Sequence, residues 1–213
     1  MTKCVTIVAL AGLGVVAASA SAQVRITEWA YSALSAGGTG EFIEFTNIGA
    51  SPVNMTGWSF DDDSQLPGVV DLSAFGLVAP GESVILTEAD ASLFRTDWGL
   101  SAAVKIIGGN TTNLGRNDEI NLFNGLTLVD RLTFGDQNIP GTIRTQNVTG
   151  ITLPSNYGTN NVAGWFFSVN GDIYGSHLSA SGDLGNPGIA AIPAPGAVAL
   201  LGLGGLMMGR RRR

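Results

Sequence analysis

Three consecutive aspartates, Asp61, Asp62 and Asp63, are the side chains in this sequence best suited to holding a metal ion. They follow the alternating apolar and polar residues 56–60, so we expect them on a loop that leaves a strand. Carboxylate oxygens gathered on a loop are the ligands that Ca²⁺ takes in proteins. The spacing matches neither an EF-hand nor a glycine–aspartate repeat, so the alternative to a calcium site is a solvated acidic turn.

The sequence offers little for enzymatic catalysis. His177 is the only histidine, and no nucleophile motif accompanies it, so we expect a surface or half-buried loop residue. Glu41 and Glu44 are three residues apart on a predicted strand, which directs them to opposite faces and separates them as acids. We therefore predict that the protein is not an enzyme and that calcium is its one candidate cofactor.

The tryptophans Trp58, Trp98 and Trp165 could form a platform on which sugars stack. They stand in segments of good strand or helix propensity, among other apolar residues. Packing in a hydrophobic core is therefore the interpretation that we favour for all three.

The elements that must position these side chains are almost all strands. We predict strands at residues 24–31, 41–46, 56–60, 83–87, 104–107, 119–123, 126–134 and 165–169. Asn124-Gly125 is a strong hairpin signal between two of them. A short helix is expected at residues 89–98, capped by Asp90, and the polar residues 136–164 predict a long loop or irregular edge. Short strands with turns at this spacing indicate an all-β, antiparallel sandwich.

The N-terminus reads as a secretory signal. A basic start leads into the apolar residues 5–16, and Ala20-Ser21-Ala22 forms a small-residue cleavage site, so we assign residues 1–22 to a signal peptide. The alternative is a retained membrane anchor. Export with cleavage removes Cys4, the only cysteine, and leaves no disulfide or thiolate site.

The C-terminus carries a second candidate targeting signal. Pro193, Ala194 and Pro195 precede an apolar run at residues 197–209, and the chain ends in Arg210, Arg211, Arg212 and Arg213. The thirteen apolar-run residues would span about 20 Å as a helix, against roughly 30 Å of hydrocarbon. We therefore expect residues 189–213 to be a processed sorting segment with transient membrane contact, and a permanent anchor is the alternative.

The net charge of the domain between the two terminal segments limits the classes of partner that it can bind. Without Lys3 and the four terminal arginines, six basic residues remain against seventeen acidic ones, a net charge of −11. Such a surface repels phosphate backbones, so we expect no nucleic-acid partner.

Several blocks of residues together resemble the lamin tail domain family. Two examples are GEFIEFTN at residues 40–47 and the turn and strand at residues 77–86. The other blocks are residues 26–29, 53–59, 117–123, 128–130 and 185–188. The resemblance covers roughly residues 24–188 and implies one immunoglobulin-like antiparallel β-sandwich, to which we assign residues 23–188.

The tail resembles the PEP-CTERM sorting signal of exported bacterial proteins, with alanine at 194 where glutamate is usual. This resemblance implies recognition by an exosortase after export, and delivery to the cell surface or extracellular matrix of a Gram-negative-type bacterium. We expect a structural or adhesive module that binds surface proteins or polysaccharide. The alternatives are a protein associated with an extracellular hydrolase or nuclease, and a calcium-dependent carbohydrate-binding module.

Overall fold

The computed structural model describes residues 23–32, 39–136 and 138–191. The expected signal peptide, the motif at Pro193, Ala194 and Pro195 and the arginines at 210–213 lie outside the described residues. Within the described ranges, no helix combines the length and the apolar character needed to span a bilayer.

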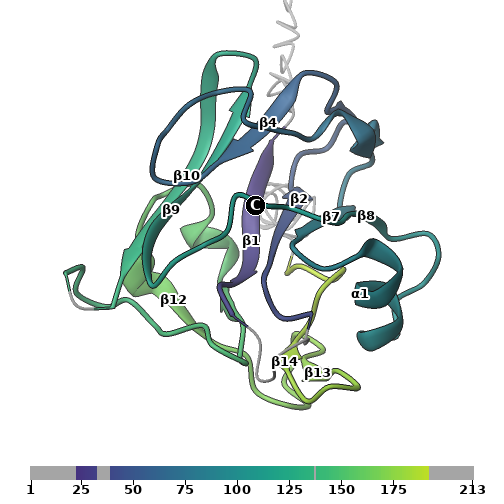
Figure 1. The fold of residues 1–213 in the computed structure, drawn as a ribbon, viewed down its shortest axis with the longest axis vertical. Coiled ribbons are helices and arrows are strands. Elements are labelled where there is room, and N and C mark those ends of the chain that lie inside the picture. Colours follow the sequence, from purple (N-terminus) through teal and green to yellow (C-terminus); the bar gives the residue numbers. More distant parts are fainter. Residues whose placement is uncertain (1–22, 33–38, 137, 192–213) are drawn as a thin grey trace, which may run out of the picture.

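Two sheets form a sandwich (Figure 1). In spatial order, the six-stranded sheet contains β12 (Trp165–Phe167), β11 (Gly150–Thr152), β1 (Val24–Ala30), β2 (Phe42–Asn47), β7 (Ser83–Thr87) and β8 (Lys105–Ile107). The four-stranded sheet contains β10 (Thr127–Gly135), β9 (Asn117–Asn124), β4 (Trp58–Asp61) and β5 (Val70–Asp71). The all-β sandwich predicted from the sequence is confirmed. Among the described strands of these two sheets, the pairings are antiparallel except that of β7 with β8, which is parallel.

Smaller elements complete the described chain. Two-residue strands pair as β3 (Val53–Asn54) with β6 (Leu77–Val78), and as β13 (His177–Leu178) with β14 (Leu184–Gly185). Short 3₁₀ turns lie at η1 (Ser73–Phe75), η2 (Pro154–Asn156) and η3 (Val162–Gly164).

The main hydrophobic core lies between the two sheets. The six-stranded sheet contributes inward side chains such as Trp29 and Phe45, and the four-stranded sheet contributes Phe60 and Phe134. The rings of Trp29 and Phe134 are 4.1 Å apart, so the two sheets are in direct contact. Trp58 and Trp165 are buried in the same core, which confirms core packing as their role.

A second apolar cluster covers part of the outer face of the six-stranded sheet. Helix α1 (Ala91–Asp97) begins at Asp90, whose carboxylate accepts hydrogen bonds from the backbone N–H groups of Ser92 and Leu93, as predicted for an N-cap. Phe94 and Trp98 pack here on Phe42, with ring centroids 5.2 and 5.9 Å from it. Trp98 is therefore buried as well, beneath α1 rather than between the sheets.

Strand β11 corrects the expectation for residues 136–164. This segment was predicted to be a long loop or irregular edge, but Gly150–Thr152 pairs with both β1 and β12 inside the six-stranded sheet. The strand is only three residues long and includes a glycine, so it has no alternation to detect. Its position is decided by partners that are distant in sequence.

Candidate functional site

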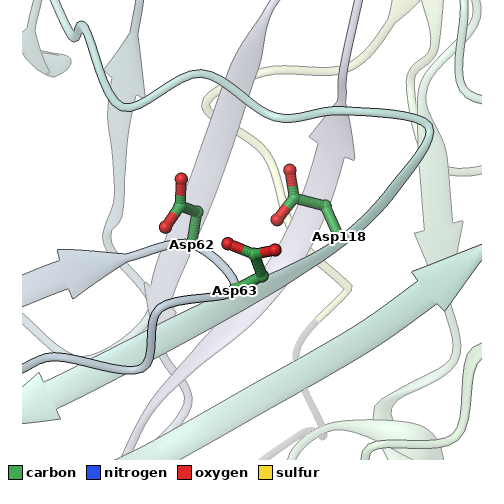
Figure 2. Close-up of side chains that lie close together, drawn as sticks. All are labelled: Asp62, Asp63 and Asp118. Carbon is green, nitrogen blue, oxygen red and sulfur yellow. The ribbon is translucent and has the colours of Figure 1, made fainter.

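The structure gathers three carboxylates at one edge of the sandwich. Asp62 and Asp63 lie on the loop that follows β4, and Asp118 lies near the start of β9. One carboxylate oxygen of each lies within 4.8 Å of the others, and Figure 2 shows the three side chains close together. The cause is the antiparallel pairing of β4 with β9, which brings the end of one strand beside the start of the other. We call Asp62, Asp63 and Asp118 the acidic cluster.

Asp61 does not belong to the acidic cluster, although the sequence placed it with Asp62 and Asp63. It is the last residue of β4, and its side chain is buried. Its Oδ2 accepts hydrogen bonds from Ser64 Oγ at 2.7 Å and from Leu66 N at 2.5 Å. Alternation along the strand separates neighbouring side chains, and Asp61 shapes the loop instead of offering its carboxylate to a ligand.

Asp118 is held firmly by its surroundings. Its Oδ2 accepts a hydrogen bond from Gly115 N at 2.6 Å, and its Oδ1 accepts one from Glu119 N at 2.8 Å. Partial burial raises the pKa of Asp118, and the negative charges of Asp62 and Asp63 raise it further. A bound cation would remove that repulsion, so the arrangement favours cations over anions.

An open cavity of about 210 Å³ adjoins the acidic cluster. Its lining includes Asp63, Asp118, Gln65, Asn117, Thr133 and Asn138. These are carboxylates, amides and a hydroxyl, which bind hydroxyl-rich ligands by hydrogen bonds. Among the described residues, the lining contains no histidine or cysteine, and its one hydroxyl, Thr133 Oγ1, donates a hydrogen bond to Glu119 Oε1 at 3.1 Å.

Glu41 and Glu44 are separated as predicted, and each has its own surroundings. Glu41 accepts a hydrogen bond from Leu114 N at 3.0 Å, and burial raises its pKa to about 8. Glu44 lies on β2 opposite Glu28 of β1, a buried acid that sequence reasoning did not single out. The only sequence signal for Glu28 was a charged residue inside a predicted strand, between Ile26 and Trp29.

His177 is half-buried, as predicted, but it begins the short strand β13 instead of lying in a loop. Its Nε2 lies 3.3 Å from the carbonyl oxygen of Trp98, and its Nδ1 lies 3.3 Å from that of Gly175. The imidazole also packs edge-on against the Trp98 ring at 5.8 Å. These contacts fasten the β13 region to the end of α1.

Comparison with known proteins identifies one family. The model of the Lamin Tail Domain matches residues 17–136, more than half of the chain. The described fold continues beyond the match with β11 and β12, which complete the six-stranded sheet. No curated protein and no solved structure matches the chain.

Proposed function

Since the chain belongs to the lamin tail domain family, we propose that it is an exported, non-enzymatic binding module of the cell surface or extracellular matrix. The two ends of the sequence support export and sorting. The domain between them supplies a rigid sandwich whose loops are free to contact a partner. Its partners are surface proteins or polysaccharide.

One observation carries this proposal: the acidic cluster borders an open cavity whose lining combines carboxylate, amide and hydroxyl groups with the apolar side chains of Phe134 and Ile139. Hydrogen-bonding groups fixed on the edges of strands are pre-organised for binding, which lowers the entropic cost of holding a ligand. A polysaccharide offers the matching hydroxyl groups along its length.

The binding proposal is tested with the exported protein recovered from cells. It is passed over immobilised glycans and over extracts of surface proteins, beside the variant Thr133→Val with Asn138→Leu. We expect capture of a polysaccharide or surface protein, and loss of that capture in the variant, because both substitutions remove polar groups from the cavity lining. Equal capture by both proteins would place binding elsewhere. Turnover of a glycan or phosphoester substrate would contradict a non-enzymatic role.

The sorting part of the proposal rests on the C-terminal sequence. Pro193 and Pro195 precede the apolar run, and Arg210–Arg213 form a block that resists transfer across a bilayer. We propose that an exosortase-type protease removes this tail after export. Intact-mass measurement of surface material should find a chain without its terminal arginines, whereas recovery of full-length tails would favour a permanent anchor.

Calcium-dependent carbohydrate binding is the second candidate function. It is favoured by the approach of Asp62, Asp63 and Asp118 to within 4.8 Å, which offers one carboxylate oxygen from each residue. Calcium takes six to eight oxygen ligands, so three carboxylates leave positions for sugar hydroxyls or water. Glycan capture that is abolished by a chelator and restored by Ca²⁺ would support this candidate, and capture insensitive to the chelator would exclude it.

A further inference from the structure

Two buried glutamates lie side by side on the two central strands of the six-stranded sheet. Glu28 of β1 and Glu44 of β2 are direct partners in the strand register, and their exposed fractions are 1% and 0%. The next pair in the register, Trp29 and Ile43, points into the main core. Because side chains alternate along a strand, the two glutamates point to the outer face of the sheet.

The last described part of the chain covers this pair. We call residues 183–189 the C-terminal strap; Figure 1 draws its β14 in yellow. The backbone N–H of Asn186 donates to Oε1 of Glu28 at 2.8 Å, and that of Gly188 donates to Oε2 of Glu44 at 2.7 Å. Each glutamate therefore holds one point of the strap.

Gly185 allows the strap to approach this closely. A Cβ atom at this position would lie 2.7 Å from Oε1 of Glu28 and 2.6 Å from Cγ2 of Thr149. Both distances are shorter than any ordinary carbon contact, so no side chain fits while the strap stays in place.

The hydrogen bonds of the two glutamates are unequal. Both oxygens of Glu44 are used, since Oε1 accepts from Thr27 Oγ1 at 2.6 Å and Oε2 accepts from Gly188 N. In Glu28, Oε1 accepts from Thr149 Oγ1 at 2.5 Å and from Asn186 N, whereas the buried Oε2 has no partner. Hydrogen bonds donated to a carboxylate favour its ionised form, so Glu44 is the better anion and Glu28 the better acid.

No described basic group compensates this pair. The four salt bridges among the described residues involve other carboxylates. The polar and titratable groups around the pair are hydroxyls, an amide and further acids: Thr27, Thr46, Ser83, Thr149, Tyr157, Ser168, Asp172, Tyr174 and Asn186. The strap itself adds the buried carboxyl of Asp183, and its Gly185 pairs with His177 of β13. Two adjacent buried anions without a counter-charge are strongly disfavoured.

We propose that the pair holds one proton, on Oε2 of Glu28, and that this proton latches the C-terminal strap onto the sheet. With the proton bound, the pair carries a single charge and the strap stays closed. When the proton leaves, the two carboxylates repel each other beneath the strap, and the strap opens to admit water.

Burial raises the pKa of both glutamates, and that of Glu28 lies well above its ordinary value because of burial and the neighbouring Glu44 charge. The closed strap is favoured at low pH, and this preference is lost as the pH rises from the ordinary glutamate range toward the raised pKa of Glu28.

The latch could also control exposure of the sorting segment. This effect rests on the proposed function, whereas the latch itself does not. The strap leads directly into the expected sorting segment. Opening it would lengthen the connection between the sandwich and that segment, by up to about 3.3 Å for each released residue. Exposure of the tail would then depend on pH.

Hydrogen exchange tests the latch in the exported protein. The backbone amides of Asn186 and Gly188 are followed from pH 5 to pH 10, after correction for intrinsic exchange. In the wild type we expect opening to rise about tenfold per pH unit where one proton is lost. In Glu28→Gln the side chain cannot ionise, so opening should become independent of pH. The variant Gly185→Ala should open the strap at every pH.

Glu41→Gln is the matched control, because it removes a second buried carboxyl that lies away from the strap. Its strap should open with the wild-type pH profile. Opening that does not depend on pH in the wild type, or that keeps its pH dependence in Glu28→Gln, would overturn the proposal. Opening controlled by added Na⁺ or Ca²⁺ at constant pH would show that a cation replaces the proton.

A second measurement covers the case in which Glu28→Gln does not fold. In Glu41→Gln protein, infrared difference spectra should show a protonated carboxyl band near neutral pH. As the pH rises, this band should be lost over the same range in which the strap opens. The sorting proposal can fail while this band is found, and the reverse also holds, so the two failures are distinguishable. A spectrum without the band at neutral pH would refute the latch.

Discussion

The backbone N–H of Ile26 donates a hydrogen bond of 2.9 Å to Oδ2 of Asp130, which joins β1 of one sheet to β10 of the other. Both strands are irregular at this point: the register shifts between Ile26 and Glu28 in β1, and between Leu128 and Asp130 in β10. Such irregularities release backbone groups from the ladder. The guanidinium of Arg25 adds a second link by donating to the carbonyl oxygen of Val129 at 3.0 Å.

Removing the Asp130 carboxylate should loosen the two sheets. Asp130→Ala leaves the buried N–H of Ile26 without its acceptor, and we expect a loss of about 2 kcal/mol in the free energy of unfolding. Asp130→Asn keeps an oxygen for Ile26 but loses the acceptor for Arg131 N, so its loss should be smaller. Urea unfolding at pH 7 measures both variants. Equal losses would mean that the Ile26 bond contributes little.

Strands with their own alternation were predictable from the sequence, and those defined by partners were not. The hairpin between β9 and β10 forms where Asn124-Gly125 predicts it, although Asn124 ends β9 and the turn itself is Gly125 and Leu126. A hairpin of this kind needs only local turn chemistry. Strand β11 has only three residues, and its place between β1 and β12 depends on distant partners. Its Ile151 pairs with Glu28, which is more than a hundred residues away along the chain. Local patterning cannot report such a contact.

The candidate site was predictable to a similar extent. Asp62 and Asp63 were found because they are adjacent in sequence. Asp118 lies beside them only because β4 pairs with β9. Asp61 lies apart from them because it ends strand β4, where successive side chains point to opposite faces of the sheet. Glu28 was missed because nothing in its neighbourhood shows that Glu44 lies opposite.

The apolar cluster beneath α1 should depend on Phe94 far more than on its neighbour Leu93. Phe94 is fully buried, whereas Leu93 is 62% exposed on the same helix. We expect Phe94→Ala to lower the free energy of unfolding by about 3 to 5 kcal/mol, and Leu93→Ala to change it by less than about 1 kcal/mol. Thermal and urea unfolding of the two variants give the comparison. Similar losses would show that α1 does not pack as described.

Glu41 should make the protein less stable at alkaline pH. Burial raises its pKa from 4.5 to about 8. Its contribution to stability is therefore fully present below about pH 4.5 and is lost as the pH rises through 8.

Glu41→Gln removes this titration while keeping an oxygen for Leu114 N. We expect the variant to match the wild type near pH 4.5 and to exceed its free energy of unfolding by roughly 2 to 4 kcal/mol at pH 9. Urea unfolding at a series of pH values is the measurement. A difference that stays constant with pH would contradict a raised pKa.

Calcium should stabilise the folded chain through Asp62, Asp63 and Asp118 rather than through the three consecutive aspartates. If these residues bind Ca²⁺ at one hundred times its dissociation constant, the free energy of unfolding rises by about 2.7 kcal/mol. The melting temperature should therefore increase with Ca²⁺, and Asp63→Asn or Asp118→Asn should abolish the increase.

Asp61→Asn is the discriminating control. Its carboxylate bonds Ser64 and Leu66 within the loop, so the variant should be less stable yet still respond to Ca²⁺. If the Ca²⁺ response were lost in Asp61→Asn but kept in Asp118→Asn, the ligands would be Asp61, Asp62 and Asp63, as the sequence predicts. If Ca²⁺ did not change the melting temperature of the wild type, the acidic cluster would be a solvated turn that binds no calcium.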